Sequence, residues 1–166
     1  MVIADFELRR WAENGGLDPY DPECINPASV DLRWSGKFRV ADYDGWSKVY
    51  PSRDRDILHI EPHQLYLLDT LEYITVPDNW CGVIALKSGI GRTGLEHLHA
   101  GFFDPGFAGT ATLEITNMAP WTAELRPFQP IIQIVFYVMK NTPKKVYADV
   151  GHYQGQREPT PARLNV

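Results

Sequence analysis

Short runs of strand-forming residues, separated at close intervals by Pro, Gly, Asn and Asp, dominate the sequence from residue 29 to residue 139. Helical periodicity is hard to find in this region. Many short strands with frequent turns are typical of an all-β barrel or a sandwich of the jelly-roll type. The runs that we interpret as strands are SVDLRW, KFRVA, ILHI, QLYLLDTLEYITV, GVIALK, GTATLEIT, AELRP and IIQIVFYVM.

One short helix is expected ahead of these strands. Asp5 can cap it, Leu8, Trp11 and Ala12 share a face at helical spacing, and a Gly-Gly pair ends it. A chain of 166 residues predicts a single domain, residues 1–166, with a real core. The tail GHYQGQREPTPARLNV lacks apolar periodicity, so it is either disordered or an arm that docks elsewhere.

The composition disfavours several classes of function. The net charge of -5 argues against a general nucleic-acid binder, because phosphate backbones attract basic surfaces. Cys24 and Cys81 are the only cysteines, which excludes a disulfide framework or a cysteine-rich zinc site. The longest apolar run has nine residues, too few to span a membrane. The first residues also lack a secretion pattern, so we expect a cytoplasmic protein.

The glycine-rich segment at residues 87–117 is the most informative part of the chain. Its first residues, KSGIGR, offer two cations, a hydroxyl and flexible backbone N–H groups, which together suit an oxyanion such as phosphate. Neither a P-loop, a dinucleotide fingerprint nor a G-x-S-x-G nucleophile turn is present. In the following GTATLEIT run, alternation places Glu114 with three threonines on one strand face. Taken alone, Glu114 is better interpreted as a solvent-facing side chain on a half-exposed strand, because Glu is seldom buried unless paired. The neighbouring KSGIGR motif favours a functional role instead.

The order of these motifs resembles the trimeric dUTPase/dCTP deaminase superfamily, in particular its dCTP deaminase branch. The core of the likeness is KSGIGR, then HAGFFDPGFAG, then the TLE strand. INPASVDLRW, LEYITVPDNW, RPFQPIIQIVF and YQGQREPTPAR resemble further family segments in the same order, so the likeness spans nearly the whole chain.

The resemblance implies a distorted β jelly-roll of the dUTPase type, assembled as a homotrimer with active sites at subunit interfaces. Residues 148–166 would form a C-terminal arm that closes over an active site. The substrate would be a deoxynucleoside triphosphate, with Mg²⁺ held mainly by its phosphates and no protein metal cage. The nucleotide-binding residues that it implies are Lys87, Ser88, Gly89, Ile90, Gly91, Arg92, Asp104, Thr112, Leu113, Glu114, Gln133, Tyr147, His152 and Gln156.

The resemblance also assigns roles, and the catalytic residues that it implies are Glu114, Ser88, Arg92, Ala100 and Asp104. Glu114 would take a proton from water and deliver one to the base, so that ammonia leaves C4 of cytosine. Ser88 and the Ala100 carbonyl would hold that water. Asp104 would meet the 3′-hydroxyl and help to activate water for pyrophosphate release. Zinc deaminases use an H-x-E and P-C-x-x-C signature that is missing here, which favours zinc-free chemistry.

Several features depart from the family pattern and leave alternatives open. The loop reads K-S-G rather than R-S-S, the EHLHAG loop is shortened, and His152 replaces a lysine. The product is either dUTP alone or dUMP and pyrophosphate. Further alternatives are a dUTP diphosphatase only and a non-catalytic nucleotide-binding regulator.

Two other features have ordinary explanations. His97 and His99 could face a metal, but structural or solvent-facing histidines are the better interpretation. The aromatic-rich segment at residues 34–50 could stack on bases, but we expect it to pack in the core and at subunit interfaces.

Overall fold

The computed structural model describes residues 1–52, 56–98 and 100–163. Its elements are α1 (Asp5–Trp11), η1 (Ala12–Gly16), β1 (Leu17–Asp18), η2 (Pro22–Cys24), β2 (Val30–Asp42), β3 (Gly45–Trp46), β4 (Tyr50–Pro51), β5 (Leu58–Ile60), β6 (Leu65–Thr75), β7 (Trp80–Leu86), α2 (Ser88–Gly91), β8 (Leu95–His97), β9 (Phe102–Phe103), β10 (Ala108–Asn117), β11 (Ala123–Leu125), β12 (Pro130–Val138) and α3 (Tyr147–Val150). Every run that the sequence pattern predicts as a strand lies in one of these strands, although SVDLRW and KFRVA join into the single long β2.

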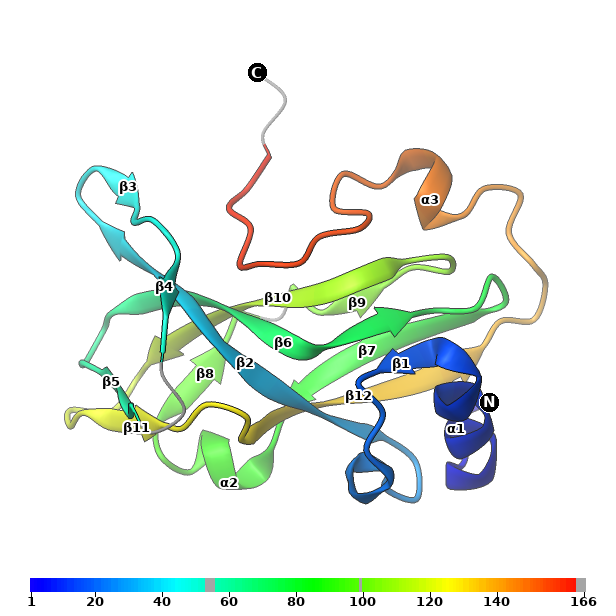
Figure 1. The fold of residues 1–166 in the computed structure, drawn as a ribbon, viewed down its shortest axis with the longest axis horizontal. Helices are drawn as coiled ribbons and strands as arrows, with labels where there is room; N and C mark the ends of the chain where they lie inside the picture. Colours follow the sequence, from blue (N-terminus) through cyan, green and yellow to red (C-terminus); the bar gives the residue numbers. More distant parts are fainter. Residues whose placement is uncertain (53–55, 99, 164–166) are drawn as a thin grey trace.

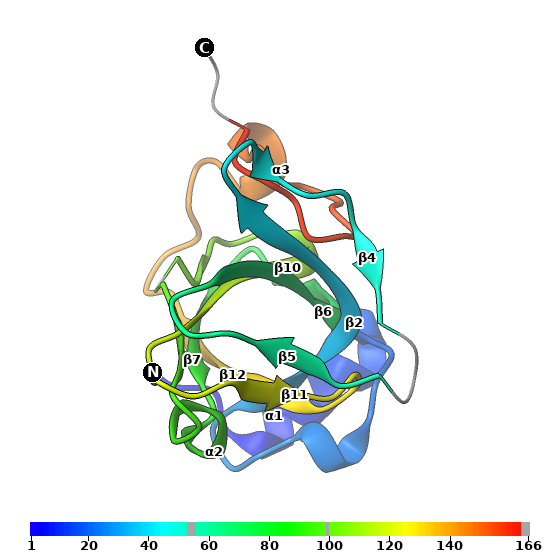
Figure 2. The same cartoon turned by 90° about the vertical axis from the view of Figure 1, so that its left-hand side faces the viewer.

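A strongly curled antiparallel sheet forms the body of the molecule (Figure 1). Its strand order is β8-β10-β6-β2-β12-β7-β9, with β1 paired to β6 and both β3 and β4 paired to β2. Strands β5 and β11 form a separate two-stranded sheet. Viewed from one end, the strands run around the core as an incomplete ring (Figure 2). The predicted all-β, jelly-roll class is therefore confirmed.

The core fills the inside of this ring because the long strands alternate apolar and polar residues. Such alternation sends every second side chain to the same face of a strand. On β10 the inward residues Leu113 and Ile115 are 1% exposed, whereas Thr112, Glu114 and Thr116 between them are half-buried. Fully buried side chains from the neighbouring strands complete the core, among them Leu32, Trp34, Leu68, Ile132, Ile134 and Phe136.

The predicted N-terminal helix is present, but its predicted cap is wrong. Ala4 occupies the N-cap position without a side-chain hydrogen bond, and Asp5 is the first helical residue. The Asp5 carboxylate instead accepts a hydrogen bond from the Phe6 N–H at 2.9 Å. The helical segment ends at Gly16, after Gly15 adopts a positive φ of 86° that favours glycine. No helix within the described residues is long and apolar enough to cross a membrane.

Three neighbouring strands, β2, β6 and β10, define the outer face on which the candidate site lies. In their register Leu67 of β6 pairs with both Arg39 of β2 and Glu114 of β10. Directly paired residues point to the same side of a sheet, so these three side chains form a row across the outer face. The next row contains Thr112 of β10 opposite Asp69 of β6. Polar and charged groups therefore gather on this face.

Candidate active site

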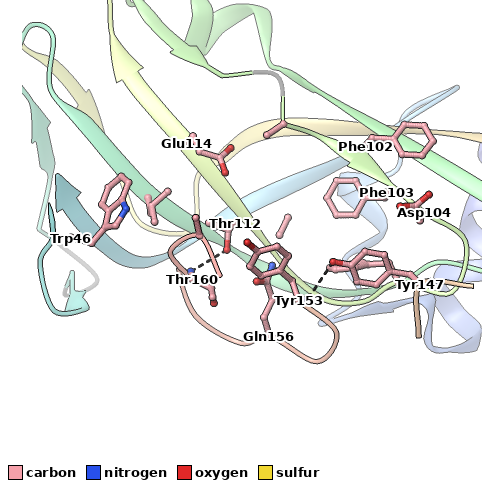
Figure 3. Close-up of a pocket in the computed structure, with 15 residues that line it drawn as sticks. Trp46, Phe102, Phe103, Asp104, Thr112, Glu114, Tyr147, Tyr153, Gln156 and Thr160 are labelled. Atoms are coloured by element: carbon pink, nitrogen blue, oxygen red, sulfur yellow. Dashed lines mark hydrogen bonds between the residues drawn. The ribbon is translucent and has the colours of Figure 1, made fainter. Parts of the chain in front are cut away.

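A cavity of about 350 Å³ lies on the outer face, between β10 and the C-terminal segment (Figure 3). Two carboxylates line it. Glu114 projects from the middle of β10, and Asp104 lies in the turn that follows β9. The two acids, ten residues apart in sequence, thus line one cavity.

Glu114 is half-buried, and few polar side chains lie near its carboxylate. Burial raises the pKa of its carboxyl above the ordinary value of 4.5. No cation or side-chain donor pairs with it among the residues that the structure describes. A carboxyl with a raised pKa in a cavity is suited to exchange protons with water and substrate near neutral pH.

Aromatic side chains form the other end of the cavity, next to Asp104. Phe103 and Phe107 pack edge-to-face with ring centroids 5.1 Å apart, and Phe107 packs similarly on Tyr147 at 5.3 Å. The Tyr147 N–H donates to the Pro105 carbonyl at 2.7 Å, which fixes α3 beside the turn that carries Asp104. Burial raises the pKa of the Tyr147 hydroxyl, with a smaller contribution from the nearby Asp104 charge.

The C-terminal segment covers the cavity and pairs with β10 of the same chain (Figures 1 and 3). The Thr110 N–H donates to the Gln156 carbonyl at 3.0 Å, and the Gln156 side-chain amide donates to the Thr110 carbonyl at 2.7 Å. Further along, the Thr160 N–H donates to Thr112 Oγ1 at 3.2 Å. We call residues 153–163 the arm. The expectation from the resemblance, that the longer C-terminal segment 148–166 closes over a bound nucleotide, stays a prediction.

A second cover comes from the hairpin between β2 and β3. Trp46, which pairs with Ala41 of β2, places its indole in the cavity lining together with Leu67 and the arm residue Ala162. The end of the cavity beyond Glu114 is therefore largely apolar. We expected this aromatic segment to serve packing only. The place of Trp46 in the cavity was not predicted, because a two-residue strand after a turn is too short to show periodicity.

The turn at residues 87–92 lies on the opposite side of the molecule from the arm. Both views show α2 and the arm at opposite ends of the vertical axis (Figures 1 and 2). The Lys87 ammonium forms an ion pair with Asp31, whose other oxygen accepts from the Asn26 side chain at 2.8 Å. Ile90 is buried. None of the predicted binding residues Lys87, Ser88, Gly89, Ile90, Gly91 and Arg92 lines the cavity of its own chain.

The remaining predicted residues divide between the cavity and other places. Lining the cavity are Ala100, Asp104, Thr112, Glu114, Tyr147 and Gln156. The Leu113 side chain points into the core, although its backbone belongs to the cavity strand. Gln133 lies on β12 opposite Asp31 and Ala85. His152 is exposed, and its carbonyl accepts from Arg163 at 2.6 Å.

Several lining residues were not predicted. They are Trp46, Leu67, Phe102, Phe103, Phe107, Ala111, Tyr153, Thr160 and Ala162. Tyr153, Thr160 and Ala162 belong to the YQGQREPTPAR motif, so their place was available from the arm resemblance.

The described residues offer no cage for a metal ion. No group of three or more His, Cys, Asp or Glu side chains among them is placed to hold one. His97 is buried on β8, and His99 lies outside the described residues. Cys24 and Cys81 are both free thiols. A magnesium cage made by this chain alone is therefore not supported.

Comparison with known proteins assigns the family. A family model described as dCTP deaminase-like matches residues 3–139. The dUMP-forming dCTP deaminase of Corynebacterium efficiens is 34% identical over 98% of this chain and 94% of its own length. That of Clavibacter michiganensis subsp. michiganensis is 36% identical over 100% of this chain and 92% of its own length. The dUMP-forming dCTP deaminase of Mycobacterium tuberculosis strain H37Rv is 35% identical over 98% of this chain and 95% of its own length.

A solved structure supports the fold independently. The crystal structure of a 2′-deoxycytidine 5′-triphosphate deaminase from Agrobacterium tumefaciens matches with a TM-score of 0.71. The match covers 82% of this chain but 48% of that one, at 19% identity, so it is a likeness of fold. Together with the family model and the full-length relatives, it leads to one conclusion: the chain belongs to the dCTP deaminase-like family.

Proposed function

We propose that this protein catalyses the hydrolytic deamination of dCTP to dUTP and ammonia, and then hydrolyses dUTP to dUMP and pyrophosphate. The names of the relatives that match the full chain support both steps. The structural observation that carries the proposal is that Asp104 and Glu114 line the same cavity. Each step consumes one water molecule, and each carboxylate would serve one step.

Glu114 is the proposed proton carrier for deamination. Its carboxylate would take a proton from water as the oxygen attacks C4, and deliver it to the amino nitrogen as the C4–N bond breaks. A pKa raised by burial brings that exchange closer to neutral pH. Ala100, which lines the same cavity, would help to hold the water through its carbonyl. Ser88 would do so from a neighbouring subunit.

Asp104 is the proposed base for pyrophosphate release. It lies at the aromatic end of the cavity beside Tyr147, which we assign to the sugar and phosphates. Thr112 and Leu113 would contact the pyrimidine through backbone groups. Gln156, which lines the cavity, would contact it from the arm.

The cavity of a single chain is incomplete for a triphosphate. No Lys or Arg lines it among the described residues, and a group with several negative charges requires cations. The cations of the 87–92 turn lie on the far side of the same chain. We therefore propose a homotrimer in which Lys87, Ser88 and Arg92 of one subunit complete the cavity of another. Gln133 and His152 would add contacts in that assembly.

Mg²⁺ enters this proposal as part of the substrate, bound to the phosphate oxygens, since no carboxylate or histidine cluster for it occurs among residues 1–52, 56–98 and 100–163. No step is assigned to zinc or to a protein-held metal. The cytoplasmic location expected from the sequence stays a prediction.

A product assay tests the proposal. Purified protein with Mg²⁺ is given dCTP or dUTP separately, nucleotides are resolved by chromatography, and ammonia is measured. Formation of dUMP from both substrates, with ammonia from dCTP only, supports the two-step enzyme. Accumulation of dUTP from dCTP restricts the activity to deamination. Turnover of dUTP alone refutes the role of Glu114, and binding without turnover refutes an enzyme for these nucleotides.

A further inference from the structure

Arg39 on β2 connects the two segments that cover the cavity. Its Nε donates to the Pro159 carbonyl of the arm at 2.8 Å, and one terminal nitrogen donates to the Ser47 carbonyl at 2.8 Å. Ser47 follows Trp46 in the β2–β3 hairpin. The other terminal nitrogen lies 3.6 Å from the Glu158 carboxylate. A planar guanidinium carries its donors on three separate nitrogens in a fixed fork, so Nε and a terminal nitrogen can each bind a different segment.

Lys37, two residues earlier on the same strand, holds the arm at a neighbouring point. Its ammonium donates to the Arg157 carbonyl at 2.9 Å and lies 3.8 Å from the Asp69 carboxylate. The Arg157 guanidinium in turn lies over the Tyr73 ring, 4.5 Å from its centroid. Residues two apart on a strand share a face, so Lys37 and Arg39 can bind alternate carbonyls of the arm, those of Arg157 and Pro159.

The segments held in this way form the walls on both sides of Glu114. Thr160 and Ala162 of the arm line the cavity, as does Trp46 of the hairpin. Thr160 is further fixed by its hydrogen bond to Thr112. Without the contacts of Lys37 and Arg39, few bonds would hold the last part of the arm near the hairpin.

We propose that Arg39 and Lys37 are positioning residues that clamp the arm and the Trp46 hairpin together over Glu114 and exclude bulk water from the reacting carboxylate. The inference rests on the proposed function for its kinetic consequence, but the clamp itself is testable without turnover. Because burial is the cause of the raised Glu114 pKa, opening the clamp would lower that pKa toward its ordinary value.

Other charged or titratable groups surround Glu114 and enter the interpretation of a pH profile. They are Asp104, Tyr147 and Tyr153 in the cavity, Asp69 on β6, Glu96 on β8, Lys37 and Arg39 on β2, and Arg157 and Glu158 on the arm. The clamp variants themselves remove a cation, either Lys37 or Arg39, and the loss of a nearby positive charge would by itself raise the Glu114 pKa. A shift of the acid limb to lower pH is therefore not explained by the lost charge.

The test compares Arg39→Ala, Arg39→Lys and Lys37→Met with Arg126→Ala, an exposed arginine outside the cavity lining. Trypsin cleavage after Arg157 is followed by mass spectrometry, because that carbonyl is the one that Lys37 binds. Thermal midpoints establish that each variant is folded. The rate of ammonia release from dCTP is then measured from pH 4.5 to pH 9.

The clamp predicts faster cleavage after Arg157 in Arg39→Ala and Lys37→Met, and wild-type cleavage in Arg126→Ala. It predicts a fall of about tenfold to a hundredfold in kcat/KM for Arg39→Ala. The acid limb of the pH profile of Arg39→Ala should move to lower pH, because the Glu114 pKa falls toward its ordinary value. Arg39→Lys should resemble Arg39→Ala, because the single nitrogen of an ammonium cannot occupy both the Nε position that binds Pro159 and the terminal position that binds Ser47.

Three results would overturn the clamp: unchanged cleavage in folded Arg39→Ala and Lys37→Met, full rescue by Arg39→Lys, or an acid limb that stays in place. If the wild-type chain turns over no nucleotide, the proposed function fails, and the cleavage rates alone decide whether the clamp exists. If Arg39→Ala does not fold, Lys37→Met carries the test.

Discussion

Asp69 gives the most quantitative prediction. Its side chain is fully buried beneath the arm, and burial raises its pKa from the ordinary 3.8 to about 6. Ser35 donates a hydrogen bond to one carboxylate oxygen, whereas the other has no hydrogen-bond partner among the described residues. The Lys37 ammonium 3.8 Å away compensates only in part.

The sign and size of the effect follow from the two pKa values. Below pH 3.8 the carboxyl is protonated in both folded and unfolded chains, so its burial as a charge costs nothing. Between pH 3.8 and 6 only the unfolded chain loses the proton, and the folded state loses stability as the pH rises. Above pH 6 the full cost is present. At about 1.4 kcal/mol per pKa unit, it amounts to ~3 kcal/mol.

Asp69→Asn removes this titration and keeps an oxygen that can accept from Ser35. The variant should therefore gain stability relative to the wild type as the pH rises from 4 to 7, by ~3 kcal/mol in total. Urea unfolding of both proteins, at four pH values and one fixed protein concentration, measures the difference in the free energy of unfolding. Glu72 and Glu114, whose pKa values burial also raises, contribute equally to both chains. A difference that stays constant within about 0.5 kcal/mol from pH 4 to pH 7 would refute the reasoning.

Three further predictions concern the cavity. Glu114→Gln should lower ammonia release from dCTP by about 10²–10⁴-fold while dUTP hydrolysis continues, because only the first step needs this proton carrier; equal loss of both activities would contradict it. Asp104→Asn should show the reverse, with dUTP accumulating from dCTP, and unchanged dUMP formation would exclude Asp104 as the second base. In Gly109→Ala the new Cβ would lie 3.1 Å from the Phe107 ring and 3.3 Å from the Gln156 backbone N and O, so the ring and the arm must shift at a cost of ~1–3 kcal/mol. Trypsin should then cleave the arm faster, and a wild-type rate would show that the arm tolerates the methyl group.

The strand pattern was sufficient to predict the fold class and the orientation of Glu114. Alternation depends only on the geometry of each strand, and that signal is present in the residues of β10 themselves. The cap of the first helix was mistaken because Asp5 favours both an N-cap and a first-turn position, and only the path of the preceding chain separates the two.

The glycines of the 87–117 segment show what local pattern cannot separate. We interpreted the KSGIGR glycines as flexible backbone that suits an oxyanion, but two glycines further along the segment are required by packing within the chain. A Cβ at Gly101 would lie 2.1 Å from Ile84, and one at Gly109 would meet the arm. Both neighbours are distant in sequence, so the requirement for glycine arises from tertiary contacts that residue spacing does not encode.

The distribution of buried charge bears on the predicted closure of the arm. Asp69 and Glu114 lie on adjacent rows of the outer face, and burial raises the pKa of both. The arm takes part in this burial: its Arg157 lines the cavity that contains Asp69, and its Glu158 further raises the Asp69 pKa. Closing the arm therefore costs desolvation of two carboxyls, which the hydrogen bonds from β2 and β10 must offset. The two contributions oppose each other, so neither the burial of the carboxyls nor the hydrogen bonds alone sets the free energy of closure.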